Sequence, residues 1–297
     1  STRSTEMSLY IISQLLIRKK DVVLVGNLSN YNANMIFQEA GANIKTIPID
    51  ENGLDINYIE KHFTKGKIRC VYVCSNRDYP TTNTLSAERR LQLLQLAKKY
   101  QFAIIEDDFD YDFQLDGSAM LPMASSDGNG MVIYLGKLGQ SLFPSFQTGF
   151  VVAPENLILE AKNYLQMLDK QGDLIQEQVL SELIYEGEIH RLLKKNSIIY
   201  KQRRDYTYEC LKRYFNENIQ FKKPSGGLAI WIEFQPSISL IQLAEEVSKL
   251  DVFLPKTILY QDKNTCAIRF GFGHLNEEEI EIVISKLKLA YDTITKS

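Results

Sequence analysis

The chain has 297 residues, of which 44% are hydrophobic and 24% charged, and its formal net charge at pH 7 is −3. This length suits one large domain or two smaller ones, and the composition is that of an ordinary globular protein. The small negative charge argues against a nucleic-acid-binding surface, and no apolar run reaches the roughly 18 residues that a membrane span needs.

The chain's start and its metal-binding residue types exclude further classes. Residues 1–6 are polar, which predicts no signal peptide, and the missing initiating Met indicates a fragment. The cysteines are interpreted as core thiols of a reducing cytoplasm, since Cys70 and Cys74 lie in an apolar run without a zinc-binding spacing. The three histidines are far apart, so no metal site is expected.

The first half of the chain alternates between predicted helices and buried strands. Apolar runs of the kind found in parallel sheets predict strands at 22–25, 44–49, 68–74, 102–105 and 131–135. Helices are predicted between them, at 6–19, 32–40, 55–62 and 86–100. This order predicts an α/β fold with a mainly parallel sheet, whose ligands bind at the carboxyl ends of the strands.

The second half is predicted to be an α+β unit. Helices are expected at 156–170, 174–185, 189–215, 240–250 and 276–294, and hairpin-like strands at 228–234 and 266–272. The long helix near 189–215 is the expected bridge. We therefore expect a large domain over 1–185 and a small C-terminal domain over 186–297 that includes this helix.

Four motifs carry a resemblance to a known family. They are Tyr-Pro-Thr-Thr (79–82), Ile-Ile-Glu-Asp-Asp-Phe-Asp (104–110), Tyr-Leu-Gly-Lys-Leu-Gly-Gln (134–140) and Ile-Arg-Phe-Gly-Phe (268–272). Together they resemble the fold-type-I aminotransferases that depend on pyridoxal phosphate (PLP), and most closely the aminotransferase-like effector domain of MocR-type regulators of the GntR superfamily. The resemblance implies the fold-type-I architecture, with a large parallel-sheet domain and a smaller α+β domain.

The resemblance also implies that several PLP contacts are lost. The lysine that forms the Schiff base corresponds to Gln140, whose amide is not a nucleophilic amine. The arginine that binds the phosphate corresponds to Gln147, and the tyrosine that binds the ring hydroxyl corresponds to Phe109. Three losses around one ligand predict that no cofactor is bound and that the chain is not an enzyme.

Other family positions are retained, each with an alternative explanation. Asp107 corresponds to the carboxylate that pairs with the pyridine nitrogen, or is a solvated or capping carboxylate at a strand end. Tyr31 corresponds to the stacking aromatic, or is a core tyrosine. Ser4 and Thr5 stand where hydroxyls hold the phosphate, or cap a helix whose Glu6 repels an anion.

Arg269 corresponds to the arginine that binds the substrate carboxylate. Its strand is otherwise apolar, so the guanidinium needs a partner. An internal salt bridge is the alternative to a ligand carboxylate.

The resemblance favours an effector-binding and dimerisation domain of a MocR/GntR-type regulator, cytoplasmic and homodimeric. It implies DNA binding through a winged-helix domain absent from this chain, and a small carboxylate-bearing effector. The alternative is a PLP-dependent enzyme of the aminotransferase class in which Lys137, three residues before Gln140, serves as a displaced lysine. A third possibility is a purely structural dimer core.

Overall fold

The computed structural model describes residues 1–117, 120–139, 142, 148–168 and 173–296 and divides the chain into two compact units. The first unit comprises residues 1–112 and 118–193, and the second comprises residues 113–117 and 194–297. Apart from the short segment 113–117, the chain passes from the first unit to the second within one long helix, α7 (Glu188–Phe215).

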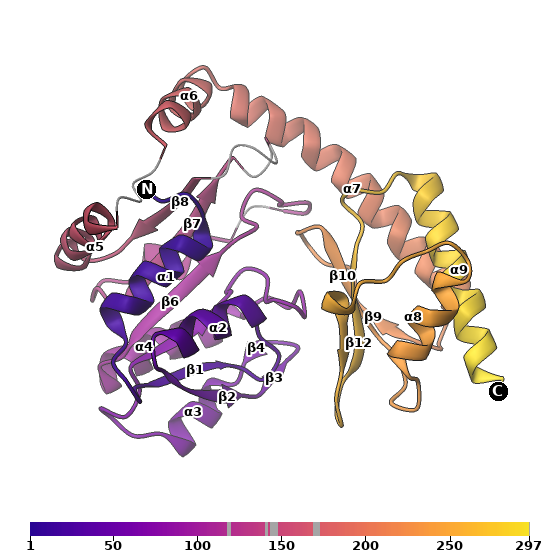
Figure 1. Ribbon diagram of the computed structural model, residues 1–297, viewed down its shortest axis with the longest axis horizontal. Coiled ribbons are helices and arrows are strands. Elements are labelled where there is room, and N and C mark those ends of the chain that lie inside the picture. The colour runs from indigo at the N-terminus through magenta and orange to yellow at the C-terminus, as the bar shows by residue number, and fades with distance from the viewer. Residues whose placement is uncertain (118–119, 140–141, 143–147, 169–172, 297) are drawn as a thin grey trace. The chain divides into compact units, whose positions relative to one another are not determined.

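The first unit is built on a six-stranded sheet with the order β2-β1-β5-β6-β7-β8 (Figure 1). All neighbours pair in parallel except β7 and β8, which are antiparallel. The strands are β1 (Val22–Gly26), β2 (Asn43–Ile47), β5 (Cys70–Val73), β6 (Ala103–Asp108), β7 (Val132–Leu138) and β8 (Thr148–Val152). The predicted fold-type-I α/β architecture is thus confirmed, with β8 as a strand that the sequence did not predict.

Helices cover both faces of this sheet. The helices of this unit, besides the start of α7, are α1 (Thr5–Leu16), α2 (Tyr31–Glu39), α3 (Ile56–His62), α4 (Ala87–Tyr100), α5 (Glu155–Met167), α6 (Leu174–Tyr185) and the short η1 (Met123–Ser126). Side chains of α1 and α2 pack with one set of strand residues, and those of α3 and α4 pack with the other set. Along β5 the sets alternate, since Tyr72 faces α1 and α2 whereas Val71 and Val73 face the opposite side.

Two local features depart from the predicted elements. The expected strand 44–49 is interrupted after Ile47, and its end forms a hairpin of β3 (Ile49–Asp50) and β4 (Gly53–Leu54). Gly53 has a φ of +90°, a conformation that glycine tolerates far better than residues with a Cβ. The first helix ends at Leu16 rather than at residue 19, and Lys20 adopts a positive φ in the turn that follows.

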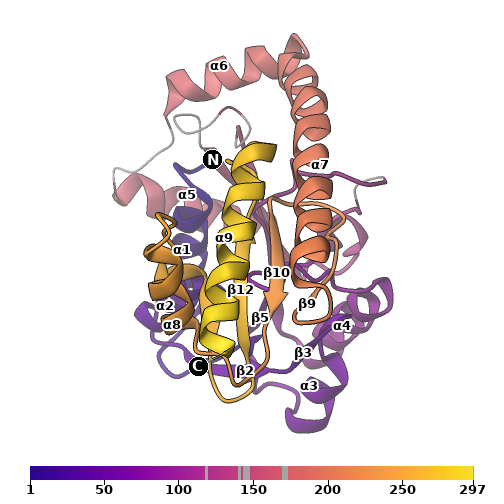
Figure 2. The ribbon, with the colours of Figure 1, turned by 90° about the vertical axis from the view of Figure 1, so that its right-hand side faces the viewer.

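The second unit is an antiparallel sheet with the order β11-β12-β10-β9 and helices packed against it. Figure 2 shows α9 in front of β12 and β10. Its elements, besides the end of α7, are β9 (Gln220–Phe221), β10 (Ala229–Glu233), α8 (Leu240–Ser248), η3 (Lys256–Ile258), β11 (Leu259–Gln261), β12 (Cys266–Gly271) and α9 (Glu277–Thr295). One apolar core joins the helices to the sheet and confirms the α+β character of this part.

Candidate active site

A cavity of about 230 Å³ lies in the first unit, where β6 and β7 end and α1 and α2 begin. Four residues singled out from the sequence line it: Thr5, Asp107, Phe109 and Lys137. Ligands of open α/β sheets bind at the carboxyl ends of the strands, so the cavity lies where the topology predicts a site.

Asp107 is the most unusual group in the cavity wall. Its side chain is buried, and its Oδ2 atom accepts a hydrogen bond of 2.7 Å from the Tyr72 hydroxyl. Its Oδ1 atom is buried without a hydrogen-bond partner among the residues that the structure describes. A buried carboxylate oxygen in this state favours a ligand that donates a proton to it.

Burial raises the pKa of Asp107 to about 7. The Tyr72 hydrogen bond opposes this rise, whereas the nearby charges of Glu6, Asp108 and Asp110 add to it. The carboxyl group therefore changes its charge close to neutral pH, as acid–base groups of functional sites often do.

The two acidic neighbours of Asp107 also have structural partners, although Asp108 Oδ1, like Asp107 Oδ1, is buried without a partner among the described residues. Glu106 accepts hydrogen bonds from the Ser75 hydroxyl and, at 2.8 Å, from the Met123 amide. Asp108 accepts from the Asn76 amide at 2.8 Å and the Tyr134 hydroxyl at 3.1 Å. Of the three consecutive carboxylates, only Asp107 lines the cavity.

The start of α1 supplies a second polar wall. The Ser4 side chain accepts a hydrogen bond of 3.1 Å from the Met7 amide and so caps the N-terminus of α1. Thr5 lines the cavity, and its buried hydroxyl has no partner within the described part of the chain. Glu6 also lines the cavity, so its carboxylate opposes the attraction of the helix N-terminus for an anion.

Lys137 adds an amine to the same cavity. It belongs to β7 and is half-buried. Its charge also lowers the pKa of the Asp112 carboxyl, which burial and Asp108 nevertheless raise to about 6. Gln140 and Gln147, the expected positions of the lost lysine and arginine, lie outside the described residues.

Of the two aromatic residues expected near the cofactor, Phe109 and Tyr31, one lines the cavity. Phe109 lines the cavity and packs edge-to-face on Tyr79, with 6.0 Å between ring centroids. Tyr31 is 71% exposed and is not part of the cavity wall, although its neighbours Asn30 and Asn32 are. The sequence indicated Tyr79 only as part of the motif at 79–82 and did not indicate Asn30 or Asn32, because tertiary contacts decide which residues border a cavity.

Arg269 belongs to the second unit. It is half-buried on β12, where it pairs in register with Trp231 of β10. Arg269 and the cavity residues therefore belong to different units of the chain.

Neither a metal site nor a membrane-spanning helix is found among the described residues. No group of three or more His, Cys, Asp or Glu side chains there could hold a metal ion. Within the same part of the chain, no helix combines the length and the apolarity required to cross a membrane.

The model of the family "Aminotransferase class I and II" matches residues 2–287. The chain belongs to this family. An uncharacterised aminotransferase of Saccharolobus solfataricus is 28% identical over 99% of this chain and 74% of its own length. An uncharacterised HTH-type transcriptional regulator of Bacillus subtilis is 24% identical over 93% of this chain, which spans 57% of that regulator.

Solved aminotransferase structures share the fold. The kynurenine aminotransferase of Pyrococcus horikoshii, crystallised with PMP, superposes with a TM-score of 0.91 at 25% identity, over all of this chain and 75% of that one.

Membership of this family corrects two expectations from the sequence. The prediction that the chain is not an enzyme is wrong, because the family model and relatives that match 99% of the chain or more point to an aminotransferase. The prediction that no cofactor binds is also wrong, since the family and its PMP-containing structure indicate a PLP-type cofactor. Both expectations depended on the three losses at Gln140, Gln147 and Phe109 and kept Lys137, which lines the same cavity as Asp107, only as the displaced lysine of the alternative.

Proposed function

We propose that the chain binds PLP in the cavity of the first unit and acts as an aminotransferase. The observation that carries this proposal is the pair of Asp107, with one buried oxygen lacking a described partner, and Lys137 in one cavity wall. When bound, PLP supplies an electron sink that allows amino groups to be transferred between amino acids and keto acids.

The residues of the cavity would have different roles in binding the cofactor. Asp107 would hold the proton at the pyridine nitrogen through a charge-assisted hydrogen bond. Lys137 would supply the amine that holds the cofactor, and the Thr5 hydroxyl, at the N-terminus of α1, would donate to its phosphate. Phe109 has no hydroxyl to offer the ring oxygen, so binding would be weaker than with a tyrosine there.

The test is a PLP titration of the purified protein followed by absorbance. We expect a new visible band that borohydride fixes onto the protein, with mass spectrometry locating the added mass on Lys137. Lys137→Ala should lose the fixed label, whereas Lys67→Ala, at an exposed position, should keep it. A wild-type protein that shows no band at saturating PLP contradicts the proposal.

A second candidate function is that of the effector and dimerisation domain of a MocR/GntR-type regulator. The observation that favours it is the set of HTH-type regulators among the relatives, one of which matches 93% of this chain. In this proposal a DNA-binding domain outside this chain contacts the operator, and the cytoplasmic homodimer responds to PLP or to a carboxylate bound by Arg269.

Thermal unfolding with a panel of amino acids tests this candidate, because binding to the native state alone raises the melting temperature. We expect a stabilising carboxylate whose effect Arg269→Gln removes, and sedimentation of the chain as a dimer. A monomer that no member of the panel stabilises contradicts the effector role, and a dimer that none stabilises leaves only a structural core.

A further inference from the structure

Tyr72 connects Asp107 to the interior of the first unit. It lies on β5, next to β6, and its ring is 4% exposed. Strand alternation places Tyr72 on the α1 and α2 face, from where its hydroxyl donates to Asp107 Oδ2 over 2.7 Å. Asp107 therefore has one oxygen bound by a neutral donor and one without a described partner.

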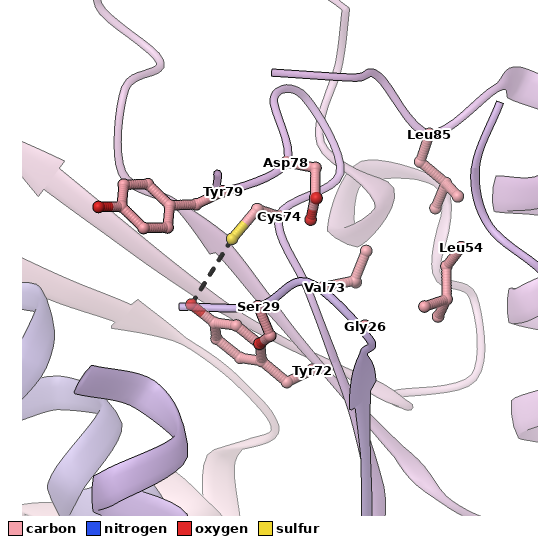
Figure 3. A pocket seen from close by; sticks show the side chains of 9 residues that line it. All are labelled: Gly26, Ser29, Leu54, Tyr72, Val73, Cys74, Asp78, Tyr79 and Leu85. Atoms are coloured by element: carbon pink, nitrogen blue, oxygen red, sulfur yellow. Dashed lines mark hydrogen bonds between the residues drawn. The ribbon is translucent and has the colours of Figure 1, made fainter. Parts of the chain in front are cut away.

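Two contacts fix the direction of the Tyr72 hydroxyl. The Cys74 thiol donates a hydrogen bond to it, with 3.5 Å between the sulfur and oxygen atoms (Figure 3). Because the phenol oxygen accepts from Cys74, its own proton is available to Asp107. The Phe37 ring packs edge-on against the Tyr72 ring at a centroid distance of 5.4 Å, which restrains the ring itself.

A small cavity lies beside the Tyr72 ring. It has a volume of about 10 Å³, is bordered by Ser29, Cys74, Asp78 and Tyr79, and has room for about one water molecule (Figure 3). A tyrosine ring needs far more volume than this, so the ring cannot move into this cavity.

We propose that Tyr72 is a positioning residue, which engages Asp107 Oδ2 and thereby reserves Asp107 Oδ1 for the ring nitrogen of the cofactor. This inference rests on the proposed binding of PLP. It assigns a role to Tyr72 and, through its thiol donor, to Cys74.

The electrostatic surroundings explain why such a donor is needed. Seven titratable groups of the described residues surround the Asp107 carboxyl or share its cavity. They are Glu6 of α1, Tyr72 and Cys74 of β5 and its end, Tyr79 of the following loop, Asp108 and Asp110 of β6 and the turn after it, and Lys137 of β7. Burial and the three neighbouring acids raise the pKa of Asp107, and the Tyr72 hydrogen bond opposes them. Without this donor, a smaller share of the carboxyl groups would be ionised at neutral pH.

The test compares Tyr72→Phe with Tyr134→Phe. Tyr134 is a matched control because it is also buried and donates to a carboxylate, Asp108, that does not line the cavity. Carbon NMR of aspartate-labelled protein without PLP, with Asp107→Asn used to assign the signal, measures the titration of the Asp107 carboxyl directly.

We expect Tyr72→Phe to raise the Asp107 titration midpoint by about one to two pH units. This shift corresponds to the free energy of one hydrogen bond to a charged group. PLP affinity at neutral pH should fall by about tenfold or more and should recover partly at a pH above the new midpoint. Tyr134→Phe should move both quantities far less, because it reaches Asp107 only through the charge of Asp108. A structural role alone would not produce recovery at high pH.

An unchanged Asp107 midpoint in Tyr72→Phe, or an equal shift in Tyr134→Phe, overturns the proposal. If Tyr72→Phe fails to fold, Cys74→Ala replaces it and should shift the midpoint in the same direction by less; no shift overturns the proposal. Should wild-type protein not bind PLP while the midpoint still shifts, the proposed function fails, and with it the assignment of Asp107 Oδ1 to a cofactor.

Discussion

Asp107 in the first unit and Asp116 in the second are both bound to a buried side chain, yet their pKa values move in opposite directions. Asp107 accepts from the neutral Tyr72 hydroxyl, and burial raises its pKa to about 7. Asp116 binds the buried guanidinium of Arg204 and also Lys201, which lower its pKa to about 2.

This difference separates a structural carboxylate from one available to a ligand. The Arg204 side chain is 1% exposed, contacts Asp205 as well, and donates to the Pro224 carbonyl at 2.9 Å, so its charge is compensated within the second unit. Asp107 has no such cation among its described hydrogen-bond partners. An uncompensated buried carboxylate costs stability, and such groups concentrate at functional sites, where a bound ligand can offset the cost.

The largest expected effect is the dependence of stability on pH that Asp107 introduces. The pKa of Asp107 in the folded protein, about 7, lies above the ordinary value of 3.8. Its contribution to the free energy of unfolding is therefore fully present below about pH 4 and is lost as the pH rises through about 7. The loss is roughly 4 kcal/mol at most, since one pKa unit corresponds to about 1.4 kcal/mol. Urea unfolding followed by circular dichroism should show this fall in wild-type protein and a flatter profile in Asp107→Asn.

Asp116 should show the opposite behaviour. Its lowered pKa predicts a contribution that is present above about pH 4 and lost as the pH falls towards about 2. Because its side chain is 41% exposed, solvent screening limits this to about 1 kcal/mol. Fluorescence of Trp231, the single tryptophan of the chain, reports unfolding of the second unit, and Asp116→Asn should reduce the acid dependence of this signal.

Arg204→Ala should lower the free energy of unfolding of the second unit by roughly 3 kcal/mol. The substitution removes a buried guanidinium from two carboxylates and a carbonyl and leaves a cavity. Trp231 fluorescence in urea measures this loss. Arg203→Ala, one residue earlier and only half-buried, should cost less, and an equal loss in both variants would contradict the structural role of Arg204.

Asp107→Asn should weaken PLP binding by roughly 10- to 100-fold. The charge-assisted hydrogen bond to the pyridine nitrogen is worth about 1.5–3 kcal/mol, and an amide cannot replace the charge. Absorbance titration with PLP measures the change. Asp116→Asn serves as the control and should leave the affinity unchanged, since Asp116 belongs to the second unit.

Phe109→Tyr should strengthen PLP binding by a few-fold. The new hydroxyl would lie at the cavity wall and donate one hydrogen bond, worth about 1 kcal/mol. Phe63→Tyr makes the same chemical change outside the cavity and should have no effect on the titration. Weaker PLP binding by Phe109→Tyr would contradict a position of the cofactor's ring oxygen next to residue 109.

Sequence patterns alone predicted much of the framework. The apolar runs predicted β1, β5, β6 and β7, because buried strands of a parallel sheet are apolar on both faces. The motif at 104–110 indicated the fold family and marked Asp107, and Ser4 was recognised as a candidate cap. The antiparallel β8 was missed although Phe150, Val151 and Val152 form a short apolar run, and its pairing with β7 at the edge of the sheet was visible only in the tertiary structure.

The sequence by itself determined the family, the α/β framework and the presence of an acidic run at the end of β6. Only the tertiary structure decided that Glu106 and Asp108 are bound internally, that Asp107 shares a cavity with Lys137, and that Tyr72 holds Asp107. The physical reason is that strand order and register choose which distant residues become neighbours. The alternation along each strand then decides which face, and therefore which partner, a side chain meets.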